Sequence, residues 1–150
     1  LKTDPMSRRI MMSYWNPSDF KSTALLPCHF SIMFYVSADK KKLNAHFIMR
    51  SNDVFLGQPF NIASYAALTY ILAKRCGYTP GELIFTGNDI HIYKNHIDAV
   101  IKQLERKPRP FPKLRLNNSI SDKDWKDITV DDFEIIGYFP YPRIAASMAV

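Results

Sequence analysis

Cysteine is scarce in this sequence, and long apolar runs are absent. The two cysteines, Cys28 and Cys76, lie far apart in the chain, so they cannot build the dense disulfide framework of a small secreted domain. No apolar run approaches the length needed to cross a membrane, and residues 1–5 lack the apolar stretch of a signal peptide. These absences favour a protein of the reducing, intracellular compartment, in the cytoplasm.

A recognisable nucleic-acid-binding pattern is also missing. The net charge of +6 suggests an anionic partner, but the basic residues are dispersed and no repeated basic and aromatic motif accompanies them. The chain has the length of one domain, 150 residues, and its hydrophobic fraction of 47% is ordinary for a globular protein. The sequence therefore predicts a single folded domain that binds an anion.

Hydrophobic periodicity predicts a mixture of strands and helices. Strands are expected at residues 8–14, 30–36, 43–50, 82–86, 113–116 and 133–138, and helices at 61–76 and 93–104. Strands 30–36 and 43–50 are expected to form a hairpin, with Leu43, Ala45, Phe47 and Met49 on one face. Gly77 is expected to end a buried central helix, and Pro80-Gly81 to turn the chain.

Two short runs concentrate the groups that could carry chemistry. Cys28 follows Pro27, and residues 49–65 bring a guanidinium, a hydroxyl, a carboxylate and an amide among apolar residues. A thiolate favoured by Arg50 would be a nucleophile for acyl carbons, disulfides or electron-poor conjugated rings. The alternative is that Cys28 is a buried small hydrophobe and that Arg50 pairs with Asp53 on the surface.

The histidines offer weaker signals. His29 would point away from Cys28 on a strand, so a simple Cys-His pair from these neighbours is doubtful. His91 and Tyr93 would share one side and could clamp sugar hydroxyls, or else be satisfied polar residues of the core. A zinc site from Cys28, His46, His91 and His96 lacks a recognised ligand spacing.

Ordered motifs along the whole chain resemble the thymidylate synthase family. They include Pro27-Cys-His29 and Arg50-Ser-Asn-Asp-Val-Phe-Leu-Gly57. The others are residues 4–9, 15–17, 59–65, 86–96 and 108–113. The resemblance covers the C-terminal portion of the family's chain, residues 1–150 here. It implies a single α/β (α+β) domain whose mixed β-sheet is packed by helices, and a homodimer formed through the sheet face.

The resemblance implies a methyltransferase that converts dUMP to dTMP. Methylenetetrahydrofolate would supply both the carbon and the hydride, after Cys28 attacks the uracil ring. The catalytic residues it implies are Cys28, Arg50, Asp53 and Asn61. The residues that would bind dUMP are Arg8, Arg9, Cys28, Arg50, Ser51, Asn52, Asp53, Asn61, His91, Ile92 and Tyr93. The residues that would bind the folate are Asp53, Leu56, Gly57, Phe60 and Ala149, and no metal is implied.

Two of these assignments carry further expectations. Arg8 and Arg9 would cross the dimer interface to the phosphate in the partner's site. The carboxamide of Asn61 can meet the N3–H and a carbonyl of uracil together, whereas the related deoxypyrimidine-monophosphate hydroxymethylases carry an acidic residue there. Asn61 therefore favours the synthase over a hydroxymethylase.

The sequence also departs from the family. Met49 replaces a usual glutamine and Asn88 a usual glycine, while Phe139, Tyr141 and Ala145 replace an aspartate, a histidine and a lysine. The family's N-terminal portion, with the glutamate that organises proton transfer, has no counterpart here. Because the first residue is Leu1, we expect a fragment of a longer protein, and a fusion to dihydrofolate reductase is one form it could take. A third hypothesis is an inactive nucleotide- or RNA-binding homologue.

Overall fold

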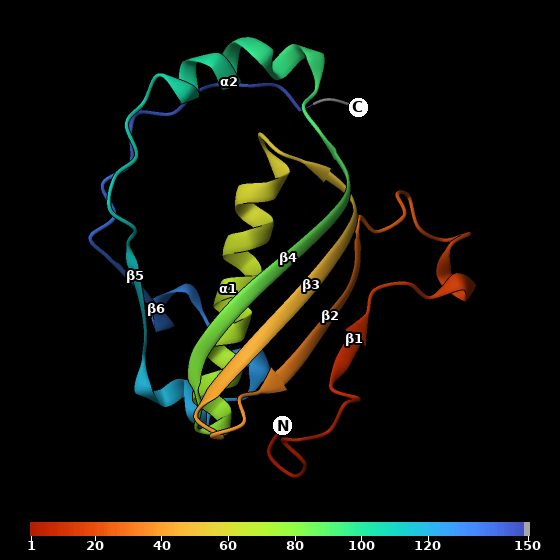
Figure 1. Cartoon of the computed structure of the whole chain (residues 1–150), viewed down its shortest axis with the longest axis vertical. Coiled ribbons are helices and arrows are strands. Elements are labelled where there is room, and N and C mark those ends of the chain that lie inside the picture. Colours follow the sequence, from red (N-terminus) through yellow and green to blue (C-terminus); the bar gives the residue numbers. More distant parts are fainter. Residues whose placement is uncertain (149–150) are drawn as a thin grey trace.

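The computed structural model describes residues 1–148, and its centre is a four-stranded mixed sheet (Figure 1). The strands lie in the order β1 (Met11–Ser13), β2 (His29–Val36), β3 (Lys42–Asp53) and β4 (Thr79–His91). The first three pair antiparallel, and β4 pairs parallel to β3. The expected mixed sheet packed by helices is confirmed, and β1 is shorter than expected.

The predicted hairpin is confirmed and supplies the core. Alternation along β3 buries Leu43, Ala45, Phe47 and Met49, each at most 2% exposed, because successive side chains of a strand point to opposite faces. Phe47 stacks on Tyr65 of the central helix at 4.2 Å between ring centroids. The register of these two strands is therefore fixed by a fully buried face.

The central helix α1 (Gly57–Cys76) connects the parallel pair β3 and β4 and packs on one face of the sheet (Figure 1). It begins four residues before the expected start at Asn61, because Pro59 falls in the first turn, where a backbone N–H has no partner within the helix. Gly77 ends it in the left-handed conformation, with φ of 77°, as the sequence predicts.

The expected turn at Pro80-Gly81 is wrong, because both residues lie within β4. Proline is tolerated there since β4 is an edge strand that pairs only with β3. A Cβ on Gly81 would lie 2.3 Å from the side-chain oxygen of Asn44. That oxygen accepts a hydrogen bond from the backbone N–H of Glu82 at 2.8 Å. The glycine thus permits close contact between strands rather than a turn.

The second helix, α2 (Ile97–Leu104), is shorter than expected and follows a 3-10 turn at Lys94–His96. Its apolar stripe is exposed, with Leu104 at 78%, and Figure 1 shows the helix standing apart from the sheet. The strands β5 (Lys113–Leu116) and β6 (Phe133–Ile136) form a separate antiparallel pair. The remaining 3-10 turns are Pro17–Asp19, Asn118–Ser121, Trp125–Asp127 and Val130–Asp132.

Candidate active site

The cysteine loop is held in place by Arg50. The backbone N–H of Arg50 donates to the carbonyl of Cys28 at 2.9 Å. Its guanidinium donates to the carbonyls of Pro27 and Leu26, both at 3.0 Å. The suggested surface pair between Arg50 and Asp53 is wrong, since no ion pair joins them. Three hydrogen bonds from one remote residue thus hold the backbone that carries the thiol.

A buried cluster that the sequence reading missed lies directly after Cys28. The hydroxyl of Tyr65 lies 2.9 Å from Nδ1 of His29, and the Tyr14 ring packs against both rings. Burial raises the pKa of Tyr65 and lowers the pKa of His29. Both groups are therefore neutral near pH 7, and the tautomer of the imidazole sets which of the two donates. No local sequence pattern joins residues so far apart in the chain.

Met49, at the position of the family's glutamine, sits between two carboxamides. Its side chain is 2% exposed, and its sulfur accepts from Nδ2 of Asn61 at 3.4 Å and from Nδ2 of Asn52 at 3.5 Å. The amide oxygen of Asn52 is buried without a hydrogen-bond partner among the described residues. The thioether, an acceptor only, therefore favours the orientation in which each amide nitrogen faces the sulfur.

Asp53 closes the turn between β3 and α1. Its Oδ1 accepts from the backbone N–H groups of Phe55 at 3.0 Å and Leu56 at 3.4 Å, and its side chain is 21% exposed. Nδ1 of His96 lies 3.9 Å from the same oxygen. The carboxylate is thus fixed by local hydrogen bonds while part of it stays accessible.

The parallel pairing of β3 and β4 brings these groups next to His91 and Tyr93. Asp53 is the register partner of His91. The rings of His91 and Tyr93 meet edge to face at 4.9 Å, so the expectation that they lie on one side is confirmed. Ser51 pairs with Asp89 two residues earlier along both strands. The ends of the two strands therefore bring residues 50–53 together with His91 and Tyr93.

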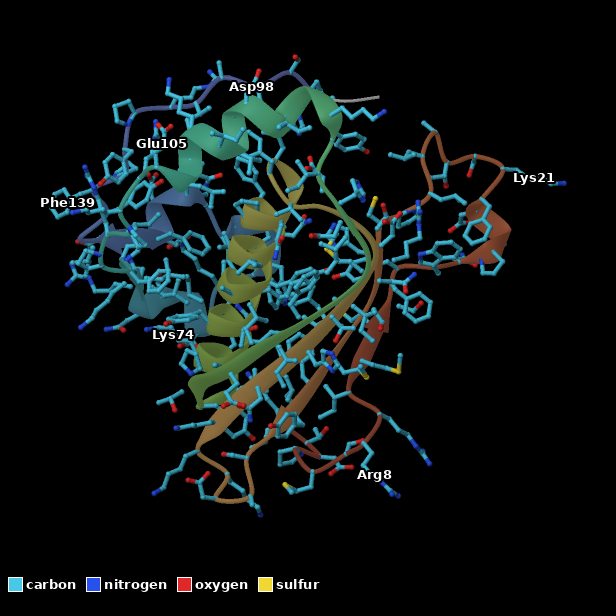
Figure 2. The ribbon with its side chains drawn as sticks, turned by 45° about the horizontal axis from the view of Figure 1, so that its top comes forward. Arg8, Lys21, Lys74, Asp98, Glu105 and Phe139 are labelled. Carbon is cyan, nitrogen blue, oxygen red and sulfur yellow. The ribbon has the colours of Figure 1, made fainter. Side chains whose placement is uncertain are left out.

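Other predicted residues occupy different places. Leu56, Gly57 and Phe60 lie at the start of α1, where Phe60 is 74% exposed, and Ile92 follows β4, at 45% exposure. Arg8 and Arg9 are exposed on the segment before β1. Figure 2 shows Arg8 pointing away from the molecule, at the end opposite α2. The structure does not bring these arginines to Cys28, and Ala149 lies outside the described residues.

Within residues 1–148, no three His, Cys, Asp or Glu side chains gather closely enough to hold a metal ion; of the set weighed for zinc, His46 bonds the hydroxyl of Thr86. No helix among these residues is both long and apolar enough to cross a membrane.

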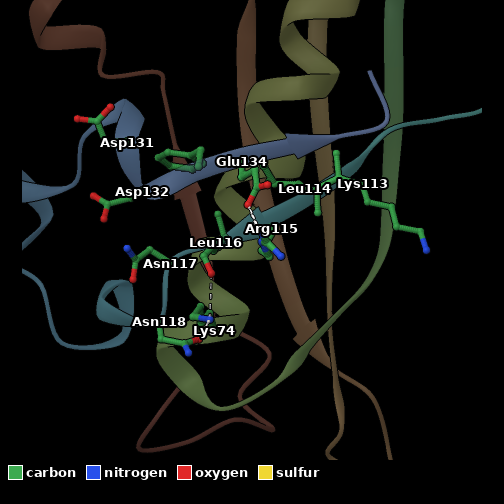
Figure 3. A pocket seen from close by; sticks show the side chains of 12 residues that line it. Lys74, Lys113, Leu114, Arg115, Leu116, Asn117, Asn118, Asp131, Asp132 and Glu134 are labelled. Atoms are coloured by element: carbon green, nitrogen blue, oxygen red, sulfur yellow. Dashed lines mark hydrogen bonds and ion pairs between the residues drawn. The ribbon is translucent and has the colours of Figure 1, made fainter. Parts of the chain in front are cut away.

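A separate hollow of about 700 Å³ lies beside β5 and β6 (Figure 3). Lys74 is held there by the carbonyl of Leu116 and the side chain of Asn118, and Arg115 pairs with Glu134. None of the predicted site residues lines it. Lys74 and Arg115 already have partners there, so we do not assign the chemistry to this hollow.

Comparison with known proteins gives one family and relatives that match the whole chain. The family described as thymidylate synthase matches residues 1–150. The thymidylate synthase of Saccharomyces cerevisiae is 50% identical over 157 residues, covering all of this chain and 51% of that protein. The thymidylate synthase of Corynebacterium aurimucosum is 47% identical over 150 residues, covering all of this chain and 54% of that protein. The chain thus spans about half the length of the curated relatives it matches.

Proposed function

The chain belongs to the thymidylate synthase family, and we propose that the protein containing it reductively methylates dUMP to dTMP with methylenetetrahydrofolate. The observation that carries this proposal is the position of the Cys28 loop. Arg50 binds this loop to the C-terminal end of β3, the end that also bears Asp53. This arrangement supports a site in which the proposed nucleophile lies near the residues proposed to bind both substrates. The co-substrate would supply one carbon and a hydride.

The nucleotide half of the proposed site uses Cys28, Arg50 and Ser51. The thiolate of Cys28 would attack carbon 6 of uracil, which makes carbon 5 nucleophilic. Arg50 has five N–H donors, and only two groups of its guanidinium bind the cysteine loop. The remaining donors are free for the phosphate, with Ser51 as a neighbouring hydroxyl donor. His91 and Tyr93 would bind the deoxyribose.

Asn61 would select uracil. Its Nδ2 already donates to the sulfur of Met49, and an amide nitrogen has a second N–H to donate to a carbonyl of the base. The amide oxygen then accepts from N3–H of uracil. Cytosine presents the opposite donor and acceptor pattern at these positions, so the hydroxymethylase alternative is disfavoured.

The residues at the start of α1 fit a folate ring in their chemistry. Oδ1 of Asp53 is engaged by two backbone N–H groups, while Oδ2 can accept from an N–H of a heterocycle. Leu56, Gly57 and Phe60 add a partly exposed, mainly apolar surface beside it. Asp53 would orient the ring, and the apolar surface would limit the access of water. Ala149 would complete this part of the site.

We further propose that two copies pair through the sheet face turned away from α1. The register aligns Met11, Met33, His46 and Ile84 in one row across all four strands. Met11 and Ile84 remain 54% and 41% exposed, and this row lines a hollow to which Arg8 also contributes. This arrangement supports the expectation that Arg8 and Arg9 reach a partner's phosphate. The fusion to dihydrofolate reductase stays a prediction.

Intact-mass spectrometry with fluoro-dUMP and methylenetetrahydrofolate tests the proposed function. The longest natural protein that carries this sequence is used, with Cys28→Ser as the matched control. Fluorine cannot leave as a proton does, so we expect a covalent ternary adduct in the wild type and none in the variant. If a folded wild-type protein forms no adduct, the proposal is wrong, and comparing dCMP with dUMP then separates a hydroxymethylase from an inactive homologue.

A further inference from the structure

The segment after residue 141 returns to the turn between β4 and α2. The carbonyl of Ser147 accepts from Nε2 of His96 at 2.7 Å and from Nδ2 of Asn95 at 3.3 Å. Ser147 is itself exposed, and it follows His96 by 51 residues. Figure 1 shows this segment running beside α2. Two side-chain donors therefore converge on one carbonyl of the C-terminal segment.

His96 is an unusual donor for such a contact because it is completely buried. Its exposed fraction is 0%, and its ring packs against Phe55 at 5.4 Å and Tyr93 at 5.7 Å between centroids. Burying an imidazole is costly unless its nitrogens find partners. A contact with an exposed segment does not require a donor to be buried. The complete burial of His96 therefore needs another explanation.

The second nitrogen of His96 supplies that explanation. Nδ1 is buried and has no hydrogen-bond partner among the described residues. Oδ1 of Asp53 lies 3.9 Å from it. Nε2 carries the proton that it donates to the carbonyl of Ser147. The two nitrogens of one ring therefore lie between a carbonyl of the C-terminal segment and the carboxylate of Asp53.

We propose that His96 is a positioning residue that fixes the C-terminal segment relative to Asp53 and so governs how tightly the reduced folate is held. Asn95 acts with it as a second, exposed donor to the same carbonyl. This inference rests on the proposed function, in which Asp53 binds the folate. His96 does not touch the reacting atoms, and it acts through the segment that it anchors.

Hydrogen exchange of the C-terminal segment tests the anchor without reference to activity. We compare wild type, His96→Phe and His96→Gln in the longest natural protein that carries this sequence, without ligands. His96→Phe keeps a planar ring but has no donor, so exchange of the amides at 144–148 should become at least tenfold faster. His96→Gln keeps an N–H donor of similar reach in its amide group and should stay within about threefold of wild type. Equal protection in wild type and His96→Phe would overturn the proposal.

A variant at the exposed neighbour keeps the test valid should His96→Phe fail to fold. Asn95→Asp preserves size but places an anionic acceptor against the carbonyl of Ser147. We expect at least threefold faster exchange at 144–148, with the unfolding midpoint unchanged. Unaltered exchange in Asn95→Asp would equally overturn the anchor.

Steady-state kinetics then test the consequence for the folate. His96→Phe should raise KM for methylenetetrahydrofolate about tenfold and KM for dUMP less than twofold, and His96→Gln should restore most of the loss. In a chain ended after Ala146, His96→Phe should add less than a twofold change. Similar increases in KM for methylenetetrahydrofolate and for dUMP would overturn the positioning role of His96. A tenfold effect of His96→Phe that persists in the chain ended after Ala146 would overturn it as well. If the wild-type protein forms no covalent adduct, the proposed function fails. The exchange measurements then still test whether His96 anchors the C-terminal segment.

Discussion

Replacing Arg50 should release the backbone that carries Cys28. The guanidinium of Arg50 makes two hydrogen bonds to the carbonyls of Pro27 and Leu26. Hydrogen bonds from a charged group contribute about 1.5–3 kcal/mol each, and the low end applies because Arg50 is partly exposed. Arg50→Met should therefore make local opening of the loop about 3 kcal/mol easier, and Arg50→Lys, which can serve one carbonyl, about 1.5 kcal/mol easier.

The rate at which iodoacetamide alkylates Cys28 measures this opening. Cys28 is partly buried, so reaction through the open loop should become faster by up to about 100-fold in Arg50→Met and about tenfold in Arg50→Lys. Cys76 is an internal control in the same digest, because it lies at the end of α1. The assay is run near pH 9.5 as well as near pH 7.5, since the thiolate is the species that reacts.

The two pH values separate the structural role of Arg50 from its effect on the thiol. Alkaline pH favours the reactive thiolate whichever residue occupies position 50, so differences between the variants there report on the opening of the loop. Equal alkylation rates for Cys28 in wild type and Arg50→Met near pH 9.5, with Cys76 unchanged, would refute the reasoning. The hydrogen bonds would then contribute nothing measurable to holding the loop.

Four other substitutions test the remaining site residues. Asn61→Asp should shift substrate preference from dUMP toward dCMP in a competition assay, and unchanged selectivity would remove its assignment to the base. Arg8→Ala should weaken binding of dUMP about tenfold, the loss of one charge-assisted hydrogen bond, and titration calorimetry that finds wild-type affinity would contradict the proposed reach into a partner's site. Met49→Leu should lower stability by less than about 1.5 kcal/mol in urea unfolding, since volume is conserved; it should also lower kcat/KM for dUMP, and a wild-type value would show that the sulfur does not orient the carboxamide. The lowered pKa of His29 means that the unfolded chain binds a proton more readily, so stability falls as pH drops below the ordinary histidine value of about 6.5. His29→Gln should lessen this fall between pH 7.5 and 5.5, and an identical fall would contradict the assigned cause.

Local sequence patterns predicted the elements that periodicity and backbone chemistry govern. The alternation of Leu43, Ala45 and Phe47 marked the buried face of β3, because a strand turns successive side chains to opposite sides. Gly77 marked the end of α1, because a left-handed residue stops the helix with little steric cost. The turn predicted at Pro80-Gly81 was wrong, because both residues lie within β4. A proline is compatible with an edge strand, and the glycine accommodates the side chain of Asn44.

The exposed stripe on α2 shows a second limit of periodicity. The apolar spacing of Ile97, Ile101 and Leu104 predicted the helix correctly, but these residues are 48–78% exposed. A hydrophobic stripe indicates that one face of a helix prefers burial, but it does not identify the surface that covers that face. Within the described residues α2 makes little contact with the sheet.

The ordered motifs of the chain by themselves determined its family, and with it the identities of the residues proposed for the site. Only the tertiary structure decided which of these residues meet. It paired Asp53 with His91 through the parallel strands, tied Arg50 to the cysteine loop, and brought Ser147 to His96. Each contact joins residues between 23 and 51 positions apart. Because such contacts depend on the packing of whole elements, neither helical nor strand periodicity can reveal them.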